Sequence, residues 1–272
     1  MKILVTGALG MLGQDLCPTL EDNGHEVIET DIQNMNITDR EQCEKFVLEK
    51  APDFIIHLAA YTNVDKAEDE PEKAELINAK GTENVARAAI KADIPIIAIS
   101  TDYVFDGTKN SPYLPDDKTN PKSVYGKTKY EGEKFIVENC KKYYIARTSW
   151  LYGIHGKNFV DTMLKLKDKD LKVVDDQTGT PTWTVDLSEA LVKLFDKPYG
   201  IYHLSGGGEP TSWYNFAKTI FEYANLKVNL SPCTSEEYPQ KANRPKYSVM
   251  DNGGMLRDWR LALKEYLKLT DI

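Results

Sequence analysis

Two residues on a predicted helix have the types and spacing needed for proton transfer: Tyr125 and Lys129. They are four apart, so their side chains project from one face of a helix, one turn from each other. A free tyrosine has a pKa near ~10 and gives up its proton poorly at neutral pH. A neighbouring ammonium is expected to lower that pKa, which makes Tyr125 a candidate general acid or base for a carbonyl oxygen. The alternative is a chance spacing, because a Tyr-x-x-x-Lys string alone is a weak signal.

The first thirteen residues predict a binding turn for a phosphate-bearing cofactor. A short β-branched run, Lys2–Thr6, leads directly into Gly7, Gly10 and Gly13. Glycine lets the backbone turn tightly and approach a pyrophosphate, whose charge then lies at the N-terminus of the following helix. A glycine-rich string between a strand and a helix is much more specific than one elsewhere. The sequence therefore predicts a dinucleotide site at the N-terminus.

An acidic residue predicts which dinucleotide is preferred. Asp31 ends a second predicted strand, Glu26–Thr30. It lies close to the position, about 20 residues past the first glycine, of the acid that binds the adenosine ribose hydroxyls. An acid there repels a 2′-phosphate, and no arginine lies near this loop, so the sequence favours NADH while leaving NADPH possible. The alternative is an ordinary loop aspartate.

Strands and helices alternate through the first half of the chain, which predicts an α/β fold with a doubly wound parallel sheet of the Rossmann type. Further strands are expected at Phe54–Leu58, Ile94–Ile99 and Tyr143–Thr148. One long helix is expected from Pro71 to Ala92. We assign residues 1–149 to a dinucleotide-binding domain and residues 150–272 mostly to a smaller substrate-binding lobe, with a strand near 201–204 that rejoins the main sheet.

Two predicted strands end in small or polar residues that should face the ligand, because the carboxyl ends of parallel strands line the crevice. Ala59, Ala60, Tyr61 and Thr62 follow the third strand, and Ser100, Thr101, Asp102 and Tyr103 follow the fourth. His57, inside the third strand, is interpreted as a hydrogen-bonded core residue and not as a catalyst.

Composition excludes several classes of partner. The net charge is −8 and no tract is dense in lysine or arginine, which argues against nucleic acid and anionic membranes. The longest apolar runs are strand-sized, too short to cross a bilayer. Four scattered cysteines without a Cys-x-x-Cys pair suit a cytoplasmic protein with reduced thiols. The histidines show no metal-ligand spacing, so no metal residue is assigned.

Three longer stretches identify a family. The chain resembles the extended short-chain dehydrogenase/reductases over nearly its whole length, and among them the dTDP-4-dehydrorhamnose reductases. The glycine turn and the Tyr125/Lys129 pair are general to the superfamily. More specific are STDYVFDG at Ser100–Gly107, RTSWLYG at Arg147–Gly153 and DQTGTPT at Asp176–Thr182.

This resemblance implies reduction of the 4-keto group of dTDP-4-dehydro-L-rhamnose, within the supply of rhamnose for cell wall polysaccharides. It implies that Tyr125 donates a proton to the keto oxygen, that Lys129 holds the nicotinamide ribose, and that Thr101 binds the same oxygen. The implied substrate contacts are Thr62, Val64, Thr101, Asp102, Tyr103, Trp150, whose apolar face would meet the 6-methyl group, and Arg244, which could pair with the diphosphate. The implied cofactor site comprises Gly7, Gly10, Met11, Leu12, Gly13, Asp31, Asn36, Ile37, Ala59, Ala60, Tyr61, Ser100, Tyr125 and Lys129.

Two rival functions stay open. A nucleotide-sugar epimerase or 4,6-dehydratase shares the fold, but dehydratases carry Asp-Glu after the threonine, and here Asp102 is followed by Tyr103. A non-catalytic regulatory subunit that only binds the cofactor is the second rival. Some relatives dimerise through carboxylate-bound magnesium, yet Asp15 stands where a glutamate is expected. Binding of Mg²⁺ therefore stays open, as does the choice between monomer and homodimer.

Overall fold

Six parallel strands form the central sheet of the computed structural model, which describes residues 1–270. Their order is β10-β5-β4-β3-β1-β2, and every neighbouring pair is parallel. The strands are β1 (Lys2–Thr6), β2 (Glu26–Thr30), β3 (Phe54–His57), β4 (Ile96–Thr101), β5 (Tyr143–Thr148) and β10 (Gly200–His203). β1 and β3 are almost completely buried, as expected for strands covered on both faces.

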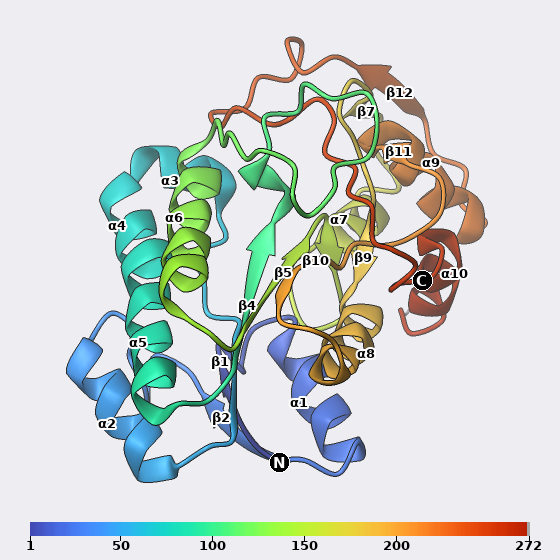
Figure 1. Cartoon of the computed structure of the whole chain (residues 1–272). Coiled ribbons are helices and arrows are strands. Elements are labelled where there is room, and N and C mark those ends of the chain that lie inside the picture. Colours follow the sequence, from blue (N-terminus) through green and yellow to red (C-terminus); the bar gives the residue numbers. More distant parts are fainter. Residues whose placement is uncertain (271–272) are drawn as a thin grey trace.

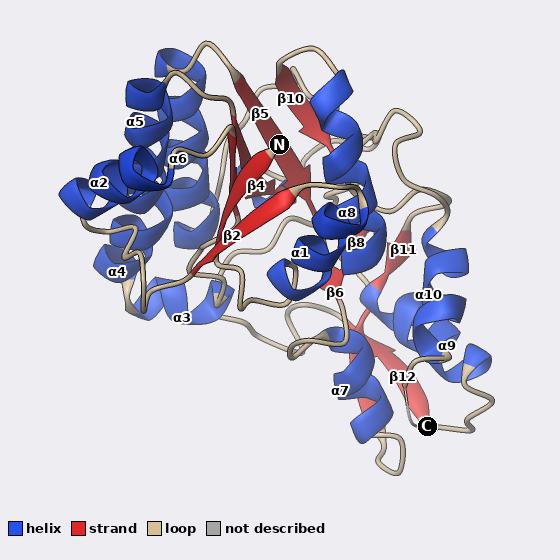
Figure 2. Cartoon of the chain, turned by 90° about the horizontal axis from the view of Figure 1, so that it is seen from below, coloured by secondary structure: helices blue, strands red, loops and turns tan. Residues whose placement is uncertain are grey.

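Helices cover both faces of this sheet, which confirms the doubly wound α/β fold predicted from the sequence (Figures 1 and 2). One face packs against α1 (Gly13–Asp22) and α8 (Thr184–Lys193), through Leu16, Leu20, Leu187 and Leu191. The other face packs against α2 (Arg40–Lys50), α5 (Thr82–Ala92) and α6 (Val124–Asn139). The 3₁₀ turn η3 (Leu194–Asp196) extends α8.

The single helix expected from Pro71 to Ala92 is interrupted. α4 (Pro71–Glu75) leads into a π-helical segment, η1 (Leu76–Gly81), and α5 follows. Within η1, the Asn78 side chain accepts from the Tyr61 N–H and donates to its carbonyl oxygen, at 2.7 and 3.1 Å. A π-helical segment is typical of functional sites, and this one fixes the loop that leaves β3. A short helix in that loop, α3 (Val64–Asp69), begins at the Asn63 cap.

The C-terminal part builds a separate hydrophobic cluster of its own. Figure 1 shows its helices and short strands gathered on one side of the sheet. Its elements are β6 (Leu151–Tyr152), α7 (Phe159–Lys165), β7 (Leu171–Val174), β8 (Thr178–Gly179), β9 (Thr182–Trp183), β11 (Thr211–Ser212), α9 (Trp213–Tyr223), β12 (Leu230–Cys233) and α10 (Trp259–Leu267). Between them the chain returns to the sheet as β10, which pairs with β5. Within residues 1–270, no helix has the length and apolar character needed to cross a membrane.

Candidate active site

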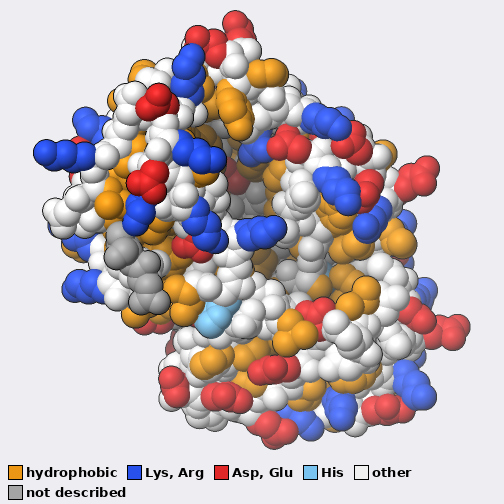
Figure 3. Space-filling model, turned by 180° about the vertical axis from the view of Figure 1, so that it is seen from behind, with side chains coloured by type: hydrophobic (Ala, Val, Ile, Leu, Met, Phe, Trp, Pro, Cys, Tyr) orange, Lys and Arg blue, Asp and Glu red, His pale blue; other side chains and the backbone are white. Residues whose placement is uncertain are grey.

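A cavity of about 730 Å³ lies where the carboxyl ends of β1, β3, β4 and β5 meet the C-terminal elements. Figure 3 shows the surface hollowed near the middle of one face. This is the position at which open α/β sheets bind their ligands. All but one of the site residues proposed from the sequence line this cavity; the exception is Tyr61.

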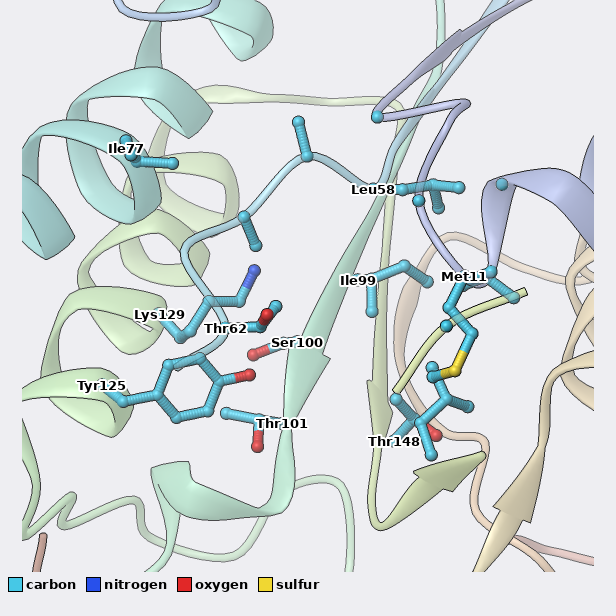
Figure 4. A pocket seen from close by; sticks show the side chains of 18 of the residues that line it. Met11, Leu58, Thr62, Ile77, Ile99, Ser100, Thr101, Tyr125, Lys129 and Thr148 are labelled. Carbon is cyan, nitrogen blue, oxygen red and sulfur yellow. The ribbon is translucent and has the colours of Figure 1, made fainter. Parts of the chain in front are cut away.

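Tyr125 and Lys129 project into the cavity from the first turns of α6 (Figure 4). Ser123 caps this helix, because its hydroxyl accepts from the Gly126 N–H at 3.1 Å. The cap fixes where the helix begins and therefore which residues face the sheet. The Tyr125 hydroxyl points toward Ser100 and Thr101 at the end of β4, and the Lys129 side chain extends into the same space.

Thr101 begins the short 3₁₀ turn η2 (Asp102–Val104), and its hydroxyl donates to Asp102 Oδ1 at 3.0 Å. Asp102 is buried, and burial raises the pKa of its carboxyl to about 6, although side-chain hydrogen bonds act against that rise. Tyr103 packs edge-to-face on Tyr125, with ring centroids 5.7 Å apart. The Tyr125 phenol and the Thr101 hydroxyl therefore lie side by side at one end of the cavity.

The expected lowering of the Tyr125 pKa is wrong for this structure. Burial raises the pKa of Tyr125 to about 12, and the Thr101 hydroxyl only partly offsets the effect. The reason is that transfer of the phenolate out of water costs more free energy than the hydrogen bond from Thr101 recovers. A phenol with this pKa is fully protonated at neutral pH, which suits a proton donor and not a resting base.

Burial also lowers the pKa of the Lys129 ammonium to about 8, against the opposing charge of Glu133 one turn further along α6. Lys129 therefore loses its positive charge as the pH rises through about 8. We expect kcat/KM for ketone reduction to fall over that interval, because this ratio reports titration of the free enzyme. A pH profile measures it, and a profile that stays flat through pH 8 contradicts the assignment. Lys127→Met, at an exposed position of the same helix, is the control and should keep the profile.

The glycine turn after β1 fits a dinucleotide. Gly7 has a left-handed backbone (φ 70°), and a Cβ there would lie 2.8 Å from the backbone of Ala59, so only glycine fits. Gly10 faces the cavity, where an added Cβ would meet only the Gly7 carbonyl oxygen, at 3.1 Å. α1 begins at Gly13, so the positive end of its dipole lies beside the same space.

Asp31 lies beside this turn, as a ribose-binding acid must. Its Oδ2 accepts weakly from the Leu9 N–H at 3.4 Å, and its Oδ1 accepts from the Ile32 N–H at 2.8 Å. The cavity is also lined by Asn36 and Ile37, which follow Asp31 in the chain, and by Met11, Leu12, Ala59 and Ala60. Tyr61 differs: its hydroxyl donates to Glu70, the residue between α3 and α4, at 2.9 Å, and the residue does not line the cavity.

Arg244 reaches the cavity from the loop after β12. Its Nη1 donates to the Tyr103 hydroxyl at 3.1 Å, and its Nη2 pairs with Asp65 at 2.7 Å. Thr62 and Val64 line the cavity as predicted, from the loop after β3 and the start of α3. The guanidinium thus connects the C-terminal part to both segments that border the catalytic end.

The Trp150 indole lines the cavity, but the expectation that it offers a flat face is wrong. Trp213 stacks on one face, with centroids 3.6 Å apart and planes within 9°. A Cβ on Gly179 would lie 2.6 Å from Cε2 and 2.8 Å from both Cζ2 and Nε1, which places the Gly179 backbone over a ring face. The Trp213 ring and the Gly179 backbone are both too close to the Trp150 indole to lie on the same face of it. Both faces of the indole are therefore covered, and only its edge is available.

Two further kinds of residue line the cavity and were not predicted. Thr6, Leu58, Ile99, Thr148 and Ser149 lie at or near strand ends, so the rule that selected Ser100 and Thr101 would have found them. Trp213 and Lys157 come from the C-terminal part and follow no such rule. His57 is a core residue as expected: its ring bonds Thr6 at 2.7 Å and Thr82 at 3.0 Å, and burial lowers its pKa to about 3.

Asp15, the residue that stands where a magnesium-binding glutamate is expected, lies with its Oδ1 atom 3.3 Å from Nε2 of His155. Among residues 1–270, no group of three or more His, Cys, Asp or Glu side chains is arranged to hold a metal ion.

A family model described as the RmlD substrate binding domain matches residues 1–271. The spore coat polysaccharide biosynthesis protein SpsK of Bacillus subtilis is 45% identical, over 98% of this chain and 97% of that protein. A crystal structure of a dTDP-4-dehydrorhamnose reductase from Clostridium acetobutylicum gives a TM-score of 0.96 at 47% identity, covering 100% of both chains. The Bacillus anthracis dTDP-4-dehydrorhamnose reductase, in complex with NADP, gives 0.95 at 41% identity, covering 99% of both.

Proposed function

This chain belongs to the family described as the RmlD substrate binding domain, and from that premise we propose that it reduces the 4-keto group of dTDP-4-dehydro-L-rhamnose to give dTDP-L-rhamnose. It is an oxidoreductase that uses a nicotinamide cofactor. One observation carries the proposal: the Tyr125 and Thr101 hydroxyls line the same cavity as the glycine turn after β1. A ketone and a dinucleotide can therefore meet in one space.

The chain supplies the groups that stabilise charge on the keto oxygen. A nicotinamide bound in this cavity would supply the hydride to carbon 4. Negative charge would then grow on the keto oxygen, where the Tyr125 phenol donates its proton and the Thr101 hydroxyl donates a hydrogen bond. Thr101 would exchange its bond to Asp102 for one to the substrate. Lys129, which lines the same cavity as Tyr125, would hold the ribose next to the nicotinamide.

The turnover assay is the direct test. Purified protein is mixed with dTDP-4-dehydro-L-rhamnose and either NADH or NADPH, and the loss of reduced-cofactor absorbance is followed. We expect turnover with this ketone and slower turnover with its epimers. A non-catalytic cofactor-binding subunit would leave the absorbance constant although the cofactor binds. An epimerase would interconvert nucleotide sugars without net consumption of NADH.

We propose that NADH is preferred and that NADPH is also accepted, because Asp31 places a negative charge where a 2′-phosphate would lie. Asp31→Ala should raise the ratio of kcat/KM for NADPH to that for NADH roughly fivefold, since one close like-charge contact in water is worth on the order of 1 kcal/mol. The two cofactors are compared at saturating ketone. Glu29→Ala, exposed on the same strand, is the control, and an unchanged ratio in Asp31→Ala would refute the role.

Two further assignments belong to this proposal. We place the cofactor domain at residues 1–149 and most of the substrate lobe at 150–272, with β10 returning to the sheet. We also propose a cytoplasmic location, supported by Cys17, Cys43, Cys140 and Cys233, which are free thiols buried in the fold. The partner is a nucleotide sugar, and monomer and homodimer are distinguished by light scattering.

A further inference from the structure

The backbone of Trp150 is held in an unusual conformation. Its φ is 48°, in the left-handed region that residues with a Cβ rarely adopt. Such a residue persists only where the surrounding structure fixes it, and positions of this kind concentrate at functional sites. Trp150 lies between β5 and β6, two residues after the end of β5, and lines the catalytic cavity. Something in the fold must therefore hold this residue in place.

The two-stranded pair β8–β11 supplies that support. Thr178–Gly179 pairs antiparallel with Thr211–Ser212, with Thr211 opposite Gly179. The pair lies beside the start of α9 (Figure 2). Gly179 covers one face of the Trp150 indole, and Trp213, the residue directly after Ser212, covers the other. We call Gly179 and Trp213 together the indole clip.

The local structure fixes both arms of the clip. Ser212 caps α9 by accepting from the Asn215 N–H at 3.1 Å, and its hydroxyl donates to Asp175. Phe159 packs against Trp213, with centroids 4.7 Å apart. On the other arm, β8 is held at both residues by β11, and no side chain fits at Gly179. The indole of Trp150 is therefore held between two groups, so that only the rim of the ring can meet a molecule in the cavity.

We infer that the indole clip is a specificity device: Trp213 and Gly179 hold Trp150 edge-on to the sugar, so that the substrate meets the indole edge. An edge-on indole limits the space for the sugar at this position, where a face-on indole would offer an apolar surface to a methyl group. Trp213 is a positioning residue in this scheme, because it acts through Trp150. The inference rests on the proposed function and deepens it.

A double-mutant cycle tests whether Trp213 acts through Trp150. The variants are Trp213→Ala, Trp150→Phe and the double variant, each assayed with dTDP-4-dehydro-L-rhamnose and NADH. We expect Trp213→Ala to lower kcat/KM for the sugar roughly tenfold, mainly through KM, with the KM for NADH unchanged. In the Trp150→Phe background the same change should have less than about a twofold effect, because coupled residues are non-additive. Trp213→Phe, which keeps a stacking ring, should recover most of the loss.

Gly179→Ala tests the other arm of the clip. It gives a second, independent result if the Trp213→Ala variant folds poorly. Its Cβ would press first on the Trp150 ring, so it should raise the KM for the sugar and not that for NADH. Trp259→Phe, in the same hydrophobic cluster but outside the cavity, is the control for general loosening of the lobe.

A crystal structure accompanies the kinetics. It should show the Trp150 and Trp213 rings stacked about 3.6 Å apart in the wild type, and Trp150 moved from that position in Trp213→Ala but not in Trp259→Phe. Equal losses from Trp213→Ala with and without Trp150, or matched rises in both KM values, would overturn the inference. So would a wild-type crystal structure in which the two indoles are not stacked. A wild-type protein that turns over no ketone refutes the proposed function instead, and the crystal structure then still reports whether the clip exists.

Discussion

Tyr125→Phe is expected to lower kcat for ketone reduction by roughly 10²–10⁴-fold, the range that a positioned general acid contributes. The change removes one oxygen and keeps the ring that packs on Tyr103. In the native protein, burial raises the pKa of the phenol to about 12, so Tyr125 carries its proton throughout the neutral range and is ready to donate it. Without that donor, charge on the keto oxygen is met by Thr101 alone. Steady-state kinetics at saturating cofactor measure the loss.

Tyr130→Phe is the matched control for this experiment. Tyr130 lies on the same helix and packs against a separate hydrophobic cluster, away from the cavity. Its hydroxyl should therefore be dispensable, with kcat within about twofold of the wild type. The account fails if Tyr125→Phe keeps most of its activity while its circular dichroism spectrum and cofactor affinity are unchanged.

Glu133→Leu is expected to lower the free energy of unfolding by about 3–5 kcal/mol, because it leaves the buried Arg147 guanidinium without its counter-ion. Both side chains are 3% exposed, and Arg147 donates to Glu133 from Nε and Nη2, at 3.0 and 2.8 Å. The pair ties α6, which carries Tyr125 and Lys129, to β5. Urea unfolding monitored by circular dichroism measures the change.

Lys134 and Glu138 give a matched comparison on the same helix. They form an exposed pair at 3.8 Å, with both side chains more than half accessible, so Glu138→Leu should cost no more than about 1 kcal/mol. The double variant Glu133→Leu with Arg147→Met should recover part of the stability, since no buried charge is left unpaired. A cost below about 1 kcal/mol for Glu133→Leu would show that the buried pair does not hold α6 to the sheet.

The fold was predictable because its signals are local. β1, β2 and β5 have the bounds that were predicted from apolar runs, and residues after β3 and β4 line the cavity as the rule for parallel sheets requires. The helix beginning at Pro71 was predicted in type but not in detail. Its π-helical segment depends on Asn78 bonding the Tyr61 backbone, a contact that helical periodicity cannot reveal.

The failures in the site have a common physical cause: they depend on contacts between distant segments. Trp150 was expected to offer a face, but Trp213 arrives from a helix far along the chain and covers it. The Tyr61 side chain turns to Glu70 for its hydrogen bond. The pKa of Tyr125 was expected to fall because spacing reveals Lys129, whereas the burial that raises that pKa appears only in the folded protein.

Isotope transfer tests the central claim most directly. The protein is incubated with dTDP-4-dehydro-L-rhamnose and NADH deuterated at the transferable position, and the nucleotide-sugar product is analysed by NMR and mass spectrometry. The account predicts dTDP-L-rhamnose with one deuterium on carbon 4 of the sugar. Deuterium on another carbon, or complete conversion of the sugar without deuterium, would contradict the account.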